Sequence, residues 1–160
     1  MKKLLKLTAV LSVMLTVIAC GKYDDTPAEP LLDVTANNIS GTWKLTEWNG
    51  SSMDNGTYVY IEFTRRDQRF TIYQNQDSFM ARKIEGDYNI TTDESLGAVI
   101  RGRYDYGNGD WRHRYIVRNL TASSMTWIAV DDSGDVSLYE RCESVPEDIA
   151  AEADGREQEK

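Results

Sequence analysis

The single histidine of this 160-residue chain, His113, is its best candidate for acid–base chemistry. It lies in the sequence WRHRY, and no Asp/Ser constellation that would form a catalytic pair can be read around it. Catalysis by a histidine requires a reacting partner within hydrogen-bond reach. We therefore predict a structural or exposed histidine, no catalytic residue, and a protein that is not an enzyme.

Other chemistry-bearing motifs are also missing from the sequence. It has no Gly-rich phosphate loop, no Gly-X-Ser-X-Gly motif and no His/Cys spacing typical of metal sites. The acidic stretches DYGNGD (105–110) and DDSGD (131–135) are candidate Ca²⁺ ligands, but neither has the spacing of an EF-hand loop. Both are typical of turns between strands, so we expect no metal and no cofactor.

Four arginines alternate along two neighbouring segments. Arg101 and Arg103 share one face of a predicted strand, and Arg112 and Arg114 share one face of the next. A hairpin of these strands would bring four guanidinium groups together. Two interpretations stay open: a solvated face paired with nearby Asp and Glu, or a basic spot that receives an anionic ligand or partner.

Aromatic side chains are the other candidate binding material, because Tyr and Trp combine apolar area with a polar group. The candidate ligand-binding residues are Tyr88, Trp111, Tyr115 and Trp127. The alternative is that these rings form an ordinary core. Tyr58 and Tyr60 alternate with aliphatic residues, which predicts that both tyrosines lie outside the core or at an interface.

These residues lie on a series of short β-rich segments. Turn sequences separate eight predicted strands, at residues 42–48, 57–64, 69–74, 78–91, 98–104, 111–120, 124–130 and 136–142. Close, regular spacing indicates successive hairpins and an all-β fold, an eight-stranded antiparallel up-and-down barrel. A two-sheet sandwich is the alternative, but its longer crossings are hard to place in loops this short.

The first strand carries Trp43 and Trp48, five residues apart. In a regular strand an odd spacing sends two side chains to opposite faces. We therefore expect Trp43 inside the barrel and Trp48 outside its wall, near a rim.

The N-terminus has the features of a secretory signal. Three lysines precede a 13-residue apolar run, which is too short to span a bilayer, and the run ends in VIAC. This ending resembles the lipobox of bacterial lipoproteins, in which the cysteine is lipidated. The resemblance implies a signal peptide over residues 1–19 and a membrane anchor on Cys20; an ordinary cleaved signal is the alternative.

Residues 20–38 follow as a predicted flexible tether, rich in proline and acidic residues. Lys22, Asp24 and Asp25 resemble a surface-export signal, which implies display on the outer membrane; a periplasm-facing anchor is the alternative. Removal of residues 1–19 takes three lysines and changes the net charge from −8 to −11. Such a charge disfavours nucleic acid as a partner.

The barrel is predicted to span residues 39–143, and an acidic tail, a frayed helix or disordered, residues 144–160. If Cys20 is lipidated, Cys142 has no partner for a disulfide, and we expect a buried inert thiol.

Three residues near the ends of the predicted barrel carry a resemblance to lipocalins. Gly41 and Trp43 resemble the Gly-X-Trp of the first lipocalin strand, and Arg141 resembles the arginine of the last strand. The resemblance implies that Arg141 stacks on Trp43 and that the pair plugs the closed end of the barrel. The sequence lacks the Thr-Asp-Tyr motif and the C-terminal helix of lipocalins.

The whole pattern is more similar to the lipocalin-like domains of Bacteroidetes-type outer-membrane lipoproteins, over roughly residues 39–142. Further shared features are Gly-X-Tyr-X-Ile at 86–90, Leu-Thr at 120–121 and the closing Tyr139 and Arg141. We therefore expect a membrane-anchored protein that binds a small apolar or amphipathic ligand. The alternative is a protein-interaction module, an accessory or inhibitory subunit of a cell-surface complex.

Overall fold

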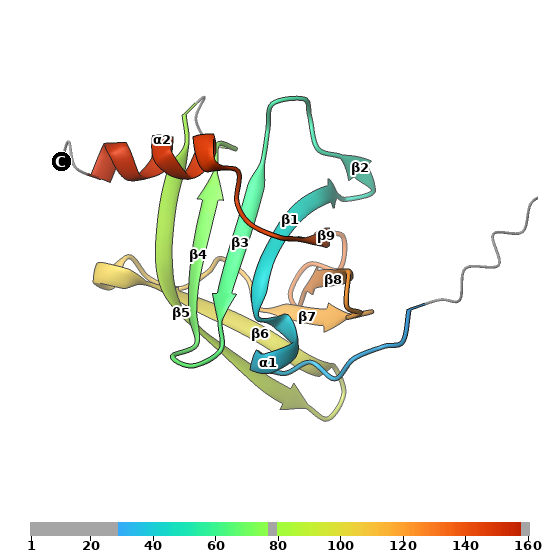
Figure 1. The fold of residues 1–160 in the computed structure, drawn as a ribbon. Coiled ribbons are helices and arrows are strands. Elements are labelled where there is room, and N and C mark those ends of the chain that lie inside the picture. The colour runs from blue at the N-terminus through green and yellow to red at the C-terminus, as the bar shows by residue number, and fades with distance from the viewer. Residues whose placement is uncertain (1–28, 77–79, 158–160) are drawn as a thin grey trace, which may run out of the picture.

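The computed structural model describes residues 29–76 and 80–157, in which the strands form one antiparallel sheet (Figure 1). Each strand of the barrel pairs with the next along the chain, and the first also pairs with the last. The sheet therefore closes into an eight-stranded up-and-down barrel, and the predicted all-β fold is confirmed.

The elements follow one another closely. The barrel strands are β1 (Gly41–Trp48), β3 (Val59–Thr64), β4 (Arg69–Gln74), β5 (Arg82–Asp93), β6 (Gly97–Tyr104), β7 (Tyr115–Arg118), β8 (Ser124–Ala129) and β9 (Val136–Cys142). The remaining elements are the short strand β2 (Ser51–Ser52), the helices α1 (Ala36–Ile39) and α2 (Glu147–Glu157), and the 3₁₀ helix η1 (Asp105–Gly107). Strand β2 pairs only with the end of β1 and adds nothing to the barrel wall.

Side-chain alternation decides what fills the barrel. On β3, Val59, Ile61 and Phe63 are buried in the main core, whereas Tyr60, between Val59 and Ile61, belongs to a separate cluster on the outside. Ile61 pairs with Trp43 of β1 and with Ile72 of β4, and directly paired residues share a face. The aliphatic face of β3 therefore points inwards, and its tyrosine face points out, as predicted.

A bulge in β1 changes the position of Trp48. Leu45 pairs with Tyr139, but Glu47 already pairs with Leu138, so Thr46 is the extra residue. The bulge reverses the alternation, and Trp48 pairs with Ser137, which shares a face with Tyr139. The Trp48 side chain is therefore on the inner face of the sheet, at the rim of the barrel, where it is 47% exposed. The predicted position outside the wall is wrong.

The chain before β1 covers one end of the barrel, which we call the closed end. The Leu32 amide donates to the carbonyl of Leu120 (2.8 Å), and Ile39 of α1 is fully buried. The Ser123 hydroxyl donates to the carboxylate of Glu29 (2.7 Å). The prediction of a free tether up to residue 38 is therefore wrong for residues 29–38, because their apolar side chains pack on the core. The rest of that prediction, and Cys20, lie outside the described residues.

The chain after β9 also packs on the barrel. Ile149, Ala150 and Ala153 of α2 belong to the outer cluster that also contains Tyr60 of β3 and Tyr73 of β4. Helix α2 lies across the upper ends of β4 and β5 (Figure 1). Of the two states predicted for the acidic tail, the structure has the helix, 11 residues long, and it is docked on the wall rather than frayed, because three small or apolar residues form a narrow stripe that we did not expect.

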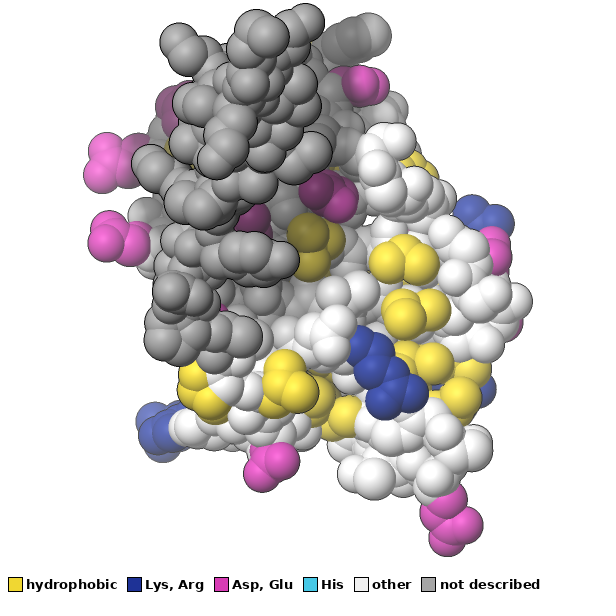
Figure 2. Space-filling model, turned by 90° about the vertical axis from the view of Figure 1, so that its right-hand side faces the viewer, with side chains coloured by type: hydrophobic (Ala, Val, Ile, Leu, Met, Phe, Trp, Pro, Cys, Tyr) yellow, Lys and Arg dark blue, Asp and Glu magenta, His cyan; other side chains and the backbone are white. Residues whose placement is uncertain are grey.

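The protein has a net charge of −8, and acidic side chains are correspondingly prominent on its surface (Figure 2). Figure 2 shows one side of the molecule, where acidic side chains project at the margins and hydrophobic side chains lie nearer the centre. Single exposed apolar residues such as Leu31 are usual on protein surfaces. Within residues 29–76 and 80–157, no helix has both the length and the apolar character needed to cross a membrane.

Candidate functional site

The closed end holds the three residues of the predicted plug. The Arg141 guanidinium lies 4.0 Å from the centroid of the Trp43 ring, a cation–π contact. Gly41, at φ +115°, leaves room for it, since a Cβ there would be 2.7 Å from Nη1 of Arg141. The Trp43 indole N–H donates to the carbonyl of Ile39 (2.8 Å). The structure thus brings Gly41, Trp43 and Arg141 together.

Each guanidinium nitrogen of Arg141 donates a hydrogen bond to a backbone carbonyl at this end. Nε donates to the carbonyl of Ala122 (2.7 Å), Nη1 to that of Ser40 (2.6 Å) and Nη2 to that of Asn38 (2.7 Å). Burial lowers the pKa of Arg141, which stays charged throughout the ordinary pH range. This guanidinium therefore ties the segment before β1 to the end of the barrel.

The four candidate ligand-binding residues lie inside the barrel. Trp127 is central, with its ring centroid 5.5 Å from that of Trp111, 5.2 Å from that of Tyr115 and 4.9 Å from that of Tyr139. Tyr88 lies apart, 5.0 Å from Phe63 by centroids, and its hydroxyl donates to the carbonyl of Thr64 (3.2 Å). The structure therefore groups Trp111, Tyr115 and Trp127 but places Tyr88 elsewhere in the core.

These rings are packed against one another rather than around open space. Trp111 and Trp127 are 8% and 3% exposed. Burial raises the pKa of Tyr115 to about 12, so its hydroxyl stays protonated at neutral pH. Burial likewise raises the pKa values of Tyr88 and Tyr139. In this structure the aromatic set is a core.

Two polar atoms of this core stand out. The indole N–H groups of Trp111 and Trp127 are buried and have no hydrogen-bond acceptor among the described residues. Buried polar groups are nearly always paired in native proteins, so each exception calls for an explanation. Sequence reasoning selected both residues, but nothing in a sequence indicates which indole lacks an acceptor.

The chain beside Trp111 departs from the predicted strand at 111–120, of which only Tyr115–Arg118 is regular. Ile100 pairs with Tyr115, and the next bridge joins Arg103 to Asp110. The four residues 111–114 therefore lie opposite only two residues of β6, 101 and 102, and the two extra residues form a bulge in the barrel wall. The sequence pattern did not predict this irregularity.

A pocket of about 230 Å³ lies at this bulge, and we call it the wall pocket. Its lining residues are Arg101, Gly102, Asp110, Trp111, Arg112, His113, Arg114, Val130 and Asp131. The Trp111 indole lies directly on Gly102, where a Cβ would come within 2.1 Å of the ring. One ring therefore bounds both the wall pocket and the aromatic core.

His113 has a structural partner in the wall pocket. Its Nδ1 lies 2.7 Å from the Asp131 carboxylate, and its side chain is only 12% exposed. This contact holds the pKa of Asp131 below its usual range. The pair anchors the bulge to the turn between β8 and β9.

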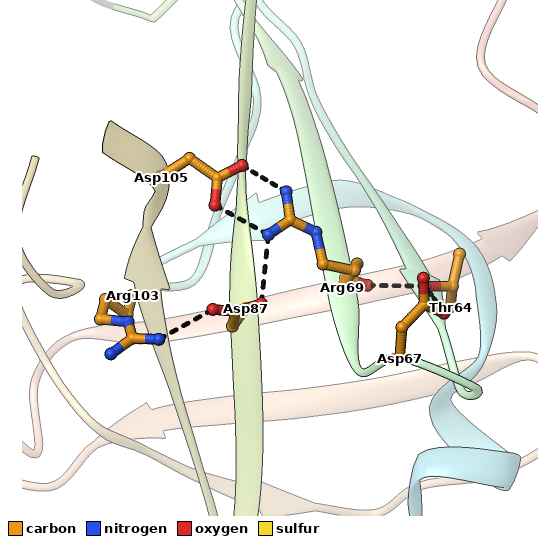
Figure 3. A network of polar contacts seen from close by, with 6 residues as sticks. All are labelled: Thr64, Asp67, Arg69, Asp87, Arg103 and Asp105. Atoms are coloured by element: carbon orange, nitrogen blue, oxygen red, sulfur yellow. Dashed lines mark hydrogen bonds and ion pairs between the residues drawn. The ribbon is translucent and has the colours of Figure 1, made fainter. Parts of the chain in front are cut away.

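The four arginines do not stay together. Arg103 forms an ion pair with Asp87 (3.0 Å), which also accepts a hydrogen bond from Arg69 (3.1 Å). Arg69 in turn donates to the carboxylate of Asp105 through two nitrogens (Figure 3). The guanidinium groups hold the pKa values of Asp87 and Asp105 below their usual range. Arg103 therefore follows the first of the two interpretations, an exposed arginine paired with a nearby carboxylate, and the other three arginines line one pocket.

The acidic stretches form connections between strands. In the turn between β8 and β9, Asp132 accepts from the amide of Gly134 (3.1 Å), and Asp105 opens the 3₁₀ helix after β6. Among the described residues, no group of three or more His, Cys, Asp and Glu side chains is placed to hold a metal ion.

The fold agrees with a comparison against known families. The model of the lipocalin-like domain matches residues 39–127, more than half of the chain, and β9 with Arg141 lies beyond the match. No curated protein matches the chain. The chain therefore belongs to the family of lipocalin-like domains.

Proposed function

We propose that this protein is a lipid-anchored outer-membrane lipoprotein whose barrel binds a small apolar or amphipathic ligand. The lipocalin-like fold supports a ligand-binding role, and the VIAC sequence ending at Cys20 supports the anchor. The observation that carries the ligand proposal is the pair of unpaired indole N–H groups of Trp111 and Trp127.

Each unpaired donor costs stability in the free protein. A buried polar group without a partner costs about 1–3 kcal/mol, and a ligand oxygen that accepts from it recovers part of that cost. The surrounding rings offer apolar contact to the rest of the ligand. A ligand with a carbonyl or ether oxygen and a compact hydrocarbon part fits these donors.

Entry of such a ligand requires movement of Trp111. This indole lines the wall pocket and contacts Trp127 on its other side, so it stands between the surface and the inner donor. When Trp111 swings outward, the ligand takes its place beside Trp127. Contacts between Trp111 and Trp127 are then replaced by contacts between Trp127 and the ligand.

Indole N–H resonances in a proton–nitrogen NMR spectrum test this proposal. The chain has four tryptophans, and Trp43 already donates to Ile39, so its signal is an internal control. With 2-nonanone as the probe, we expect the Trp111 and Trp127 signals to move downfield in a saturable way and that of Trp43 to stay. No saturable shift, or an equal shift of all four, would contradict the proposal.

A matched pair of variants locates the donor. Trp127→Phe removes the inner N–H and should weaken 2-nonanone binding by about tenfold, the value of one hydrogen bond. Trp48→Phe removes a rim indole whose N–H already donates to Asp135 (2.8 Å), and should leave the affinity unchanged. A larger loss of affinity in Trp48→Phe than in Trp127→Phe would instead indicate a binding site at the rim.

The anchor has its own test. Incorporation of a fatty-acid analogue should vanish in Cys20→Ala, and persistent label would contradict lipidation at this residue. Protease treatment of intact cells separates the two orientations, because only a surface-displayed domain is cleaved without breaking the outer membrane.

A protein partner is the second candidate, and Tyr106 favours it. This tyrosine is 97% exposed on η1 and has a left-handed backbone at φ 58°, which is unfavourable for a non-glycine residue. Asp105 beside it is held by Arg69, so the ring is presented on an anchored turn. Crosslinking on intact cells should capture one partner with the natural chain and lose it with Tyr106→Gly, which suits the same backbone.

A further inference from the structure

The wall pocket contains three cationic side chains that the fold does not use. Arg101, Arg112 and Arg114 all line it, all are exposed, and none has a carboxylate within ion-pair distance among the described residues. The other arginines near the barrel ends behave differently. Arg69 is paired with carboxylates, and Arg141 is bonded to backbone carbonyls.

The local charge is opposite to that of the whole molecule. Besides the three guanidinium groups, Asp110 and Asp131 line the wall pocket, and Asp131 is already engaged by His113. Three guanidinium groups therefore face two carboxylates, an excess of one positive charge in a concave site on a protein of net charge −8. A concentration of like charges opposes itself unless a counter-charge is bound, and the concave shape strengthens the local field.

The backbone holds these groups in place. The carbonyl of Arg114 accepts from the amide of Val130 (2.8 Å), and the amide of Trp111 donates to the carbonyl of Gly102 (2.9 Å). With His113 fixed to Asp131, both ends and the middle of the bulge are attached to the barrel. The extra residues that interrupt the sheet thus present Arg112 and Arg114 on a fixed loop opposite Arg101.

The other lining residues indicate what else the ligand contains. Trp111 and Val130 supply apolar surface beside the guanidinium groups. The pocket volume of about 230 Å³ corresponds to roughly eight water molecules at liquid density, which suits a compact ligand rather than a lipid chain. Guanidinium groups bind carboxylates and phosphates with paired hydrogen bonds.

We propose that the wall pocket is a binding site for a small organic anion, a carboxylate or phosphate ester with a compact apolar group. The anionic oxygens lie against Arg101, Arg112 and Arg114, and the apolar group lies against Trp111 and Val130. This site does not depend on the ligand proposed for the barrel interior, because it requires no movement of Trp111.

Titration calorimetry with three probes tests the proposal. The probes are benzoate, phenyl phosphate and benzamide, which share one ring and differ in charge. We expect both anions to bind, more weakly as salt is raised, and benzamide to bind at least tenfold more weakly than benzoate. The stronger of the two anions identifies the headgroup. Equal binding of benzoate and benzamide, or no binding of either anion, would overturn the proposal.

Two double variants with the same change in charge locate the site. Arg112→Gln with Arg114→Gln should weaken binding of the stronger anion by tenfold or more. Arg66→Gln with Arg118→Gln alters two exposed arginines outside the wall pocket and should change it by less than threefold. Equal losses in both would show a general charge effect and overturn the assignment. The Trp127 indole shift with 2-nonanone should persist in the first variant, so the two proposals fail separately.

Discussion

The closed end and the wall pocket use the same residue types in opposite ways. At the closed end, Arg141 stacks on Trp43, all three of its nitrogens have carbonyl acceptors, and the indole N–H is paired. At the wall pocket, the N–H of Trp111 is unpaired and three guanidinium groups are exposed without ion-pair partners among the described residues.

The difference comes from the local path of the chain. At the closed end, α1 and the turn before β8 bring backbone carbonyls to the guanidinium, so the polar groups are satisfied inside the fold. At the wall pocket, a bulge separates β6 from the chain that should pair with it, and donors are left over. Stability is therefore expected to depend on the closed end, and binding on the wall.

Loss of the plug should have the largest effect on stability. Trp43→Ala removes a fully buried ring and should lower the free energy of unfolding by about 3–5 kcal/mol. Trp48→Ala, at the exposed rim, should cost less than about 1 kcal/mol. Urea unfolding followed by circular dichroism measures both. A similar cost for the two variants would break the contrast between the buried plug and the rim.

The arginine of the plug should come next. Arg141→Gln leaves the carbonyls of Asn38, Ser40 and Ala122 with fewer donors and should cost about 2–3 kcal/mol. Protection of the Leu32 amide from hydrogen exchange should fall at the same time, since the covering segment loses its attachment. Unchanged protection would show that apolar packing alone holds this segment.

A methyl group at Gly102 should disturb the wall. Gly102→Ala places a Cβ where the Trp111 ring lies, and overpacking of this kind costs about 1–2 kcal/mol. We also expect the Trp111 indole N–H to gain exposure to solvent, measured by hydrogen exchange. Gly155→Ala in α2 meets no atom within 4 Å and should not destabilise, because alanine favours a helix.

Acid should act on the carboxylate network of Figure 3. Asp87 and Asp105 have lowered pKa values in the folded protein, so the unfolded chain binds protons first as the pH falls. Their contribution to stability is fully present above about pH 4 and is lost below it. Urea unfolding at several pH values should show this loss of stability at low pH in the natural chain and a smaller loss in Asp105→Asn.

Substitutions in the wall pocket should have the smallest effect on stability. Arg101→Gln removes an exposed charge with no ion-pair partner and should change the free energy of unfolding by less than about 0.5 kcal/mol. It should also leave the acid dependence unchanged. A large loss of stability would mean that this arginine is structural, like Arg141, and would remove the contrast.

Local rules predicted some features of the site but not others. Alternation correctly put Tyr60 outside, because strand parity needs only neighbouring residues. The same rule was wrong for Trp48, because one extra residue in β1 reverses parity and no local sequence signal marks Thr46 as that residue. It also kept Arg103 with the other arginines, although its partner Asp87 lies directly opposite on the neighbouring strand β5.

The sequence by itself determined the number and order of the barrel strands and the lipocalin-like family, because hydrophobic period, turn residues and the Gly41–Trp43 spacing are local properties. Tertiary structure alone decided which polar groups find partners. Whether an indole or guanidinium is satisfied depends on acceptors carried by segments far away in the chain, such as Asn38 for Arg141. The pairing register, including its bulges, decides which of these groups meet, and it therefore decides why one end of the barrel is plugged while the wall has an open pocket.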